Sequence, residues 1–180
     1  MAVLRITKYP EKVLKTKSKK VEGWSDELSK LVEDMFETMY AVSGVGLAAN
    51  QIGIPLRLAV IDVRPGGQSR RLVLINPKLT ALEGKQEEPE GCLSLPGIYK
   101  RLGRAAKARV LCYDQKGMPW EIRGTGLLAR ALQHEIDHLD GKLFVDRLSI
   151  MQKVNVQKEI KRYQTIWERQ VTTRPALVAD

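Results

Sequence analysis

The stretch Thr125-Gly-Leu-Leu-Ala-Arg-Ala-Leu-Gln-His-Glu-Ile-Asp-His-Leu-Asp-Gly141 decides what the rest of the chain must fold around. It holds the only histidines of the chain, His134 and His138, in the pattern H-E-x-x-H. Residues four apart lie on one face of an α-helix, so both imidazoles can reach a single ion. Glu135 lies beside the first histidine, where it can take a proton from an activated water molecule. The stretch therefore predicts a metal-binding helix.

The apolar pattern supports this helix and predicts that it spans 125–139 and ends at Gly141. One narrow stripe contains Leu127, Ala131, His134 and His138, and an adjoining stripe contains Leu128, Leu132, Ile136 and Leu139. Glu135 lies between the two stripes, whereas Arg130, Gln133, Asp137 and Asp140 are predicted to point outward. Burying two histidines and a carboxylate without partners costs several kcal/mol each. A metal site therefore explains the pattern better than a chance match on a charged helix.

A catalytic metal usually has three protein ligands, and the chain has two cysteines to offer as the third. Cys92 lies in Glu90-Gly-Cys-Leu-Ser-Leu-Pro96, where Gly91 frees the backbone and Pro96 is expected to end any strand. Taken alone, Cys92 is equally explained as an unpaired thiol in the core. Cys112 lies in a β-type segment and is interpreted as a small buried apolar residue. No disulfide is expected, because nothing in the sequence indicates an oxidising compartment.

A third informative segment, Ser43-Gly-Val-Gly-Leu-Ala-Ala-Asn-Gln-Ile-Gly53, follows an amphipathic helix predicted over 25–42 with Ser25 as its N-cap. Its glycines end the helix and let backbone approach a ligand closely. The segment lacks the lysine and the glycine spacing of a phosphate-binding loop. It is either a tight connection or part of a site, and Gln51 is an amide donor with no obvious structural role.

Taken together, three segments resemble the motifs of the peptide deformylase family. They are Gly44-Val-Gly-Leu-Ala-Ala-Asn-Gln51, Glu90-Gly-Cys-Leu-Ser94 and Gln133-His-Glu-Ile-Asp-His138. In this order they match the family motifs G-x-G-x-A-A-x-Q, E-G-C-L-S and Q-H-E-x-D-H. The resemblance extends from about Pro10 to Ser149. It implies a metal-dependent hydrolase that removes the N-formyl group, as formate, from the N-terminal formylmethionine of newly synthesised polypeptides.

The resemblance also implies roles for individual residues. The metal ligands would be Cys92, His134 and His138, and the general acid/base would be Glu135. The amide of Gln51 and the backbone N–H of Leu93 would stabilise the oxyanion. The backbone at Val45 and Gly46 would align the substrate, and Val45, Leu127 and Ala131 would form an apolar pocket for methionine. The metal would be Fe²⁺ in the cell, with Zn²⁺, Ni²⁺ or Co²⁺ also able to bind in purified protein. Family members differ at 97–104, so the substrate contacts of that segment stay open.

The remaining sequence predicts one α+β domain over 1–170, with a flexible tail at 171–180. Its mostly antiparallel short sheets would pack around the central metal-binding helix. The expected strands are Leu56–Val63, Leu72–Leu79, Ala108–Asp114 and Trp120–Arg123. A C-terminal helix is expected from after Ser149 to about Gln170, with its apolar side formed by Ile150, Val154, Ile160, Tyr163 and Trp167.

The chain of 180 residues carries a net charge of +9, from 30 basic and 21 acidic residues. Such an excess favours an anionic partner, and the ribosome, reached through the basic C-terminal helix, is the candidate; a basic surface that only keeps the protein soluble is the alternative. We expect no DNA partner, no membrane segment and a monomer. The first residues lack the apolar core of a signal peptide, which predicts a cytoplasmic protein.

Two other functions compete with the hydrolase. An H-E-x-x-H metalloprotease would share the helix but takes its third ligand downstream, and no histidine follows His138. A non-catalytic, basic RNA-binding protein would explain the charge but not the metal ligands. Release of formate from a formylmethionyl peptide, without cleavage of internal peptide bonds, separates the three.

Overall fold

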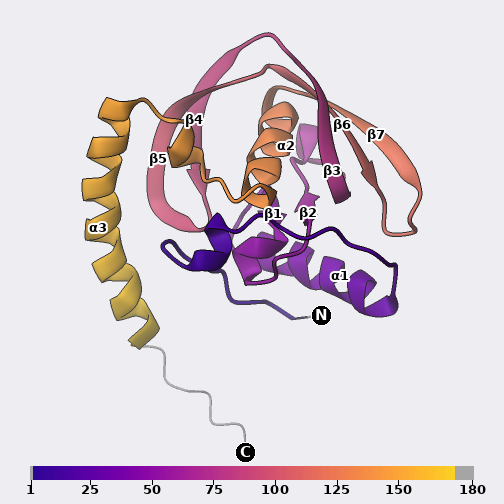
Figure 1. Ribbon diagram of the computed structural model, residues 1–180, viewed down its shortest axis with the longest axis horizontal. Helices are drawn as coiled ribbons and strands as arrows, with labels where there is room; N and C mark the ends of the chain where they lie inside the picture. Colours follow the sequence, from indigo (N-terminus) through magenta and orange to yellow (C-terminus); the bar gives the residue numbers. More distant parts are fainter. Residues whose placement is uncertain (1, 173–180) are drawn as a thin grey trace, which may run out of the picture.

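Helix α2 (Gly126–Leu139) lies at the centre of the computed structural model, which describes residues 2–172. Figure 1 shows it between a two-stranded hairpin and a larger sheet. The hairpin consists of β4 (Gln86–Cys92) and β5 (Leu95–Arg104). The larger sheet has the order β1-β2-β3-β6-β7, with antiparallel neighbours throughout. Its strands are β1 (Gly46–Ala48), β2 (Leu58–Ile61), β3 (Leu72–Glu83), β6 (Lys107–Tyr113) and β7 (Pro119–Thr125).

Two further helices and four short 3₁₀ helices complete the architecture. The longer ones are α1 (Asp26–Ala41) and α3 (Ile150–Thr172). The short ones are η1 (Lys12–Lys15), η2 (Ala49–Ile52), η3 (Pro65–Gly67) and η4 (Phe144–Arg147). This arrangement confirms the predicted α+β class with short antiparallel sheets around a central helix. None of the helices that the structure describes is long and apolar enough to cross a membrane.

Glycine fixes the position of α2 at both ends. A Cβ at Gly124 would meet the side chain of Leu132 and the backbone of Ala129, so β7 can lie this close to the helix only with glycine there. Gly141 follows the helix with a φ of +72° and packs against the backbone of Lys15. Because both positions exclude a larger residue, the chain enters and leaves the central helix along a fixed path.

The polar side of α2 is buried, which corrects the prediction that it faces outward. Arg130, Gln133 and Asp137 are 9%, 5% and 4% exposed. Each has a partner in or next to the β4–β5 hairpin, which covers that side of the helix: Arg130 donates to the carbonyl of Pro89, Gln133 bonds the backbone of Ala105, and Asp137 accepts from Arg104. The apolar periodicity of the helix could not predict that the hairpin covers this side. The hairpin contacts it through hydrogen bonds to polar side chains and leaves no apolar stripe in the helix sequence.

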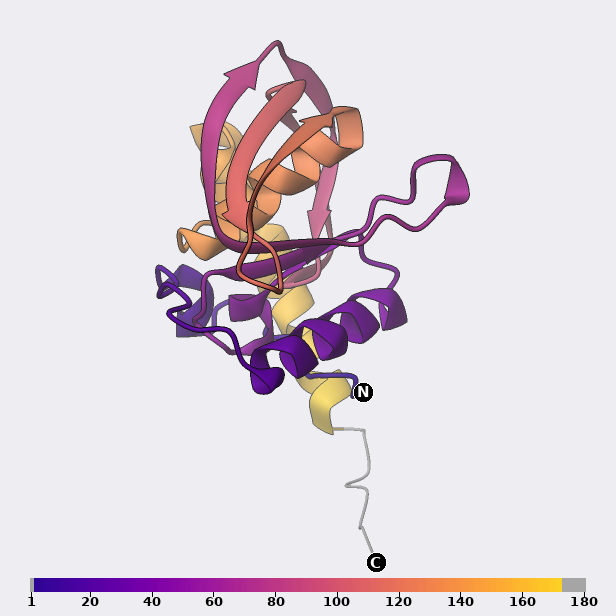
Figure 2. The same cartoon turned by 90° about the vertical axis from the view of Figure 1, so that its right-hand side faces the viewer.

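Three apolar clusters hold the layers together. One joins α2 to the larger sheet through residues such as Leu74, Val110 and Leu132. The second joins α1 to the other face of β1, β2 and β3, where Met35 and Phe36 are fully or almost fully buried. Figure 2 shows α1 beneath these strands and the loop that follows β2 extending from the body. Helix α1 has the predicted N-cap, because the Ser25 side chain accepts from the Leu28 N–H.

The third cluster joins α3 to the outer side of β5. Val156, Ile160 and Trp167 are buried there with Leu95 and Ile98. The expected apolar side of this helix is therefore only partly correct. Ile150 and Val154 are 84% and 55% exposed, because at about 100° per residue they lie on a different side of the helix from Val156, Ile160 and Trp167, which face the body. The helix continues to Thr172, two residues into the predicted tail, and the rest of that tail, 173–180, lies outside the described residues.

The four expected strands correspond to β2, β3, β6 and β7, although β3 continues to Glu83. Three strands were missed: β1, β4 and β5. Pro96 does not end a strand but lies at the start of β5. A proline is tolerated there because the hairpin has only two strands, so one edge of each needs no ladder partner.

Candidate metal centre and active-site cleft

Three side chains that the sequence predicted as ligands converge beside α2. Cys92 is the last residue of β4, and His134 and His138 lie one turn apart on the helix. The Nε2 atom of His138 is 3.1 Å from Cys92 Sγ and 3.1 Å from His134 Nε2. All three ligand atoms lie within 4.8 Å of one another. In a tetrahedral site with metal–nitrogen bonds of about 2.0–2.1 Å, two nitrogen ligands stand about 3.3 Å apart. The thiolate and two imidazoles therefore fit a divalent transition-metal ion.

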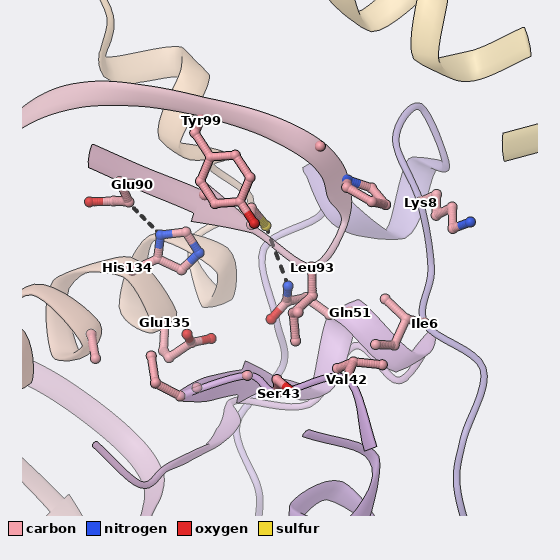
Figure 3. Close-up of a pocket in the computed structure, with 18 of the residues that line it drawn as sticks. Ile6, Lys8, Val42, Ser43, Gln51, Glu90, Leu93, Tyr99, His134 and Glu135 are labelled. Carbon is pink, nitrogen blue, oxygen red and sulfur yellow. Dashed lines mark hydrogen bonds and ion pairs between the residues drawn. The ribbon is translucent and has the colours of Figure 1, made fainter. Parts of the chain in front are cut away.

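Glu90 orients the first histidine, a role that the sequence reasoning missed. Its Oε1 lies 2.6 Å from His134 Nδ1 (Figure 3). The other ring nitrogen, Nε2, is thereby left to face His138 and Cys92. Burial opposes ionisation of Glu90, but hydrogen bonds from His134 and Arg104 lower the pKa of this carboxyl to about 2. Its position at the start of the E-G-C-L-S motif was the available signal. Burial also lowers the pKa of His138 well below its usual value, which keeps that imidazole neutral.

Glu135 is buried beside the ligands with an unused oxygen. The residue is 3% exposed, and among the described residues its Oε2 has no hydrogen-bond partner. Burial raises the pKa of Glu135 to about 7. The backbone of Gly46 lies against it, so that a Cβ at that position would overlap the carboxylate. The glycine of β1 therefore provides the space that Glu135 occupies, and the carboxylate is placed for proton transfer near neutral pH.

Gln51 has its amide fixed in one orientation. The side chain is almost fully buried, and its Oε1 accepts from the Ala48 N–H at 2.9 Å. Its Nε2 therefore points the other way, 3.5 Å from Cys92 Sγ and 3.2 Å from Ser94 Oγ. Figure 3 shows this amide facing the sulfur across the cleft. The fixed orientation presents a hydrogen-bond donor beside the candidate metal site.

The site opens into a cleft of about 1200 Å³. Its lining includes all four residues predicted to bind substrate: Val45, Gly46, Leu127 and Ala131. Val45 and Leu127 are 41% and 51% exposed, so both apolar side chains can contact a ligand in the cleft. The N-terminal segment 3–6 and Tyr99 also line the cleft, and neither was foreseen. Leu93 lies in the turn between β4 and β5, beside Gln51 in Figure 3.

Cys112 does not belong to this site. It is buried in the cluster between α2 and the larger sheet, where burial raises the pKa of its thiol to about 12. A thiol with so high a pKa is a poor metal ligand at neutral pH. The prediction that Cys112 is a buried apolar residue is confirmed.

Comparison with known proteins agrees with this geometry. The family model of polypeptide deformylase matches residues 3–154. The peptide deformylase of Thermodesulfovibrio yellowstonii is 49% identical over 162 residues, covering 89% of this chain and 98% of the relative. The crystal structure of a peptide deformylase from Legionella pneumophila superposes with a TM-score of 0.87 at 43% identity, covering 97% of this chain and 100% of that one.

A second solved structure extends the comparison. The peptide deformylase from Ehrlichia chaffeensis, solved in complex with actinonin, has a TM-score of 0.85 at 38% identity and covers 91% of this chain and 98% of its own. Sequence identity and fold therefore agree over nearly the whole length of both proteins. The chain belongs to the peptide deformylase family.

Proposed function

We propose that Cys92, His134 and His138 hold one divalent metal ion and that the protein uses it to hydrolyse the formyl amide of formylmethionyl peptides. Peptide deformylases are metal-dependent hydrolases that act on formylated new chains. The observation that carries the residue assignment is the convergence of three ligand atoms within 4.8 Å, next to a buried carboxylate. A bound divalent ion would supply Lewis acidity, which polarises the formyl carbonyl and makes water a stronger acid.

Glu135 is the proposed general acid/base. Its free oxygen would accept a proton from the water that attacks the formyl carbon. The same carboxyl would then give that proton to the α-nitrogen of methionine as the bond between this nitrogen and the formyl carbon breaks. The products are formate and a free N-terminal amine. Burial raises the pKa of this carboxyl, which helps it to hold the proton between the two steps.

Gln51 and Leu93 are the proposed oxyanion donors. As water attacks, negative charge develops on the former carbonyl oxygen. The Gln51 Nε2–H is already directed by the bond between its Oε1 and Ala48, so no reorientation is needed when the charge appears. The Leu93 N–H, in the turn that follows Cys92, would add a second donor.

The apolar part of the cleft is the proposed methionine pocket. Val45, Leu127 and Ala131 line it close to the ligands, and the backbone at Val45 and Gly46 would pair with the substrate peptide. Because methionine is unbranched and flexible, it fits irregular apolar surfaces well. The pocket would therefore select the first residue of the chain, and the cleft beyond it would hold the residues that follow.

The decisive experiment is a formate-release assay with a formylmethionyl tripeptide. We expect stoichiometric formate and a free amine, with the internal peptide bonds intact. Cleavage of those bonds would indicate a metalloprotease instead. Absence of any hydrolysis by metal-loaded protein would favour the non-catalytic RNA-binding alternative.

We propose Fe²⁺ as the metal in the cell, with Zn²⁺, Ni²⁺ or Co²⁺ able to replace it in purified protein. Both ferrous iron and a thiolate ligand react with oxygen, so iron-loaded enzyme should lose activity in air. Nickel- or cobalt-loaded enzyme should remain active under the same conditions. Equal and stable activity of the iron and zinc forms in air would contradict this assignment.

We further propose that residues 1–170 act as one catalytic unit and that the protein is a cytoplasmic monomer that docks on the ribosome through α3. The support for docking is the charge of that helix. Lys153, Lys158, Lys161 and Arg162 are all exposed, while Val156, Ile160 and Trp167 attach the opposite side of the helix to the body. The exposed side chains of such a helix can contact phosphate groups while its apolar side stays packed against β5.

A further inference from the structure

Arg104, the last residue of β5, is buried in a network of charges behind the metal site. Its side chain is only 2% exposed. It donates from Nε and NH2 to the two oxygens of Glu90, at 3.1 and 2.7 Å, and from NH1 to Asp137 Oδ2 at 2.6 Å. One guanidinium thus joins β4, β5 and α2. Neither the family motifs nor the mechanism above gives Arg104 a role.

The network reaches a metal ligand through a single carboxylate. Glu90 Oε1 is shared between Arg104 NH2 and His134 Nδ1, which it contacts at 2.6 Å. The opposite nitrogen of that imidazole faces His138 and Cys92. A rotation of the Glu90 carboxylate would therefore weaken the bond that holds the His134 ring in the orientation that its proposed role as a ligand needs.

Arg104 also sets the distance between the elements that carry the ligands. Cys92 comes from the β4–β5 hairpin, whereas both histidines come from α2. Arg104 bonds Glu90 on the hairpin and Asp137 on α2. It therefore links the element that carries Cys92 to the helix that carries both histidines. Asp137 has a second arginine, Arg147, but that side chain is 44% exposed and lies in η4. Among the residues that the structure describes, only Arg104 joins Asp137 to Glu90.

We propose that Arg104 is a positioning residue that determines how firmly the metal site retains its ion, acting through Glu90 on His134 and through the hairpin on Cys92. The inference rests on the proposed metal ligation. Arginine suits this role because its planar fork meets both oxygens of a carboxylate while a third N–H meets another acceptor. Lysine carries the same charge but cannot reproduce that geometry.

An ordinary structural ion pair is the competing explanation, and the hairpin offers a matched control. Arg101 pairs with Glu87 across the same two strands, 3.7 Å apart, but those side chains are 62% and 67% exposed and take no part in the bonds between Arg104, Glu90 and Asp137. Replacing Arg101 changes the charge of the hairpin without touching the network around Glu90. If metal release changes on replacing Arg104 but not on replacing Arg101, the cause is the hydrogen-bonding position of Arg104 and not the loss of a positive charge from the hairpin.

The test measures the rate at which cobalt-loaded protein loses its ion to an excess of EDTA. The variants are Arg104→Lys, Glu90→Gln, the two combined, and Arg101→Met. Removing a residue that hydrogen-bonds a metal ligand typically lowers the metal affinity by about 10–100-fold. We therefore expect Arg104→Lys and Glu90→Gln each to release cobalt about 10–100-fold faster than the parent protein. The visible absorption of the bound cobalt should shift in both, whereas Arg101→Met should match the parent protein. The combined variant should release cobalt about as fast as Arg104→Lys alone, because that substitution already breaks the path through Glu90.

Folding of each variant is checked by circular dichroism. If Arg104→Lys does not fold, the neutral pair Arg104→Gln with Glu90→Gln replaces it and should release cobalt faster than Glu90→Gln alone, because the link to Asp137 is lost as well. Wild-type release from Arg104→Lys, or a neutral pair that only matches Glu90→Gln, would overturn the inference. Failure of the parent protein to bind cobalt through Cys92, His134 and His138 would instead overturn the proposed function.

Discussion

At the scale of single residues, the contact between Gly46 and Glu135 makes a strong prediction. A Cβ at Gly46 would overlap the carboxylate, so Gly46→Ala must displace Glu135. General acid–base help is typically worth about 10²–10⁴-fold, and we expect Gly46→Ala to lower kcat by about 10²-fold while the metal content stays normal. The assay is formate release with parallel elemental analysis. Gly23→Ala is the control, because a Cβ there meets nothing within 4 Å. Normal turnover in Gly46→Ala would show that the position of Glu135 does not limit the reaction.

The ligand assignment is also tested residue by residue. Cys92→Ala, His134→Ala and His138→Ala should each lose most of the bound metal, because the proposed site has three protein ligands and the remaining two would bind an ion weakly. Cys112→Ala should keep its metal, since that thiol lies in a separate core cluster. Elemental analysis of the four purified variants decides the matter. A full metal content in Cys92→Ala would remove this cysteine from the site.

At the scale of elements, Asp62 holds the loop that follows β2. Its buried carboxylate accepts from Tyr40 Oη at 2.8 Å, from Ser69 Oγ at 2.7 Å and from the backbone N–H groups of Arg64 and Arg70 at 3.1 and 3.0 Å. Burial opposes ionisation, but these four hydrogen bonds lower the pKa of Asp62 from 3.8 to about 2. The bonded carboxylate therefore stabilises the fold above pH 3.8, and this stabilisation is lost as the pH falls through about 2.

We accordingly expect Asp62→Asn to lower the free energy of unfolding by about 1–3 kcal/mol at pH 7, the usual cost of a hydrogen bond to a charged group. The difference from the parent protein should shrink between about pH 4 and pH 2, because the unfolded chain binds a proton at Asp62 below about 3.8 and the folded protein does so only near 2. Urea unfolding at several pH values measures it. A difference that is constant from pH 7 to pH 2 would mean that the charge of Asp62 contributes nothing.

At the scale of the whole molecule, the net charge of +9 is the basis for the proposed contact with the ribosome. Truncation after Ser149 is a poor test, because it would expose Leu95 and Ile98 by removing the helix that covers them. Changing Lys153, Lys158 and Lys161 to glutamine keeps the packing side of α3 intact. These three side chains are exposed.

We expect the triple variant to bind ribosomes more weakly in co-sedimentation. The slope of the logarithm of the binding constant against the logarithm of the salt concentration should also fall by about 1 for each phosphate contact that is lost. Hydrolysis of a free formylmethionyl tripeptide should not change. The control replaces Lys17, Lys19 and Lys20, which are equally exposed but lie in the N-terminal segment. Equal losses in both triple variants would indicate nonspecific attraction by net charge, and no loss in either would make α3 an ordinary solvated surface.

What the sequence determined by itself was the set of features that depend on neighbours in the chain. The spacing of His134 and His138 specifies one helical face, because the rise and twist of a helix are the same wherever it forms. The N-cap at Ser25 and the glycine at 141 are likewise local signals. The three family motifs added Cys92 and Gln51 to the site, and the geometry brings both beside the histidines.

Only the tertiary structure decided what lies behind the site. The β4–β5 hairpin escaped prediction because Gln86-Glu-Glu-Pro-Glu-Gly-Cys92 has a poor strand propensity and is held as a strand by its partner, β5. That hairpin buries Arg130, Gln133 and Asp137, and it brings Arg104 and Glu90 behind His134. These contacts join residues 14 to 44 positions apart. No local pattern encodes them, because burying a charged group is favourable only when a partner from elsewhere in the fold compensates its lost hydration.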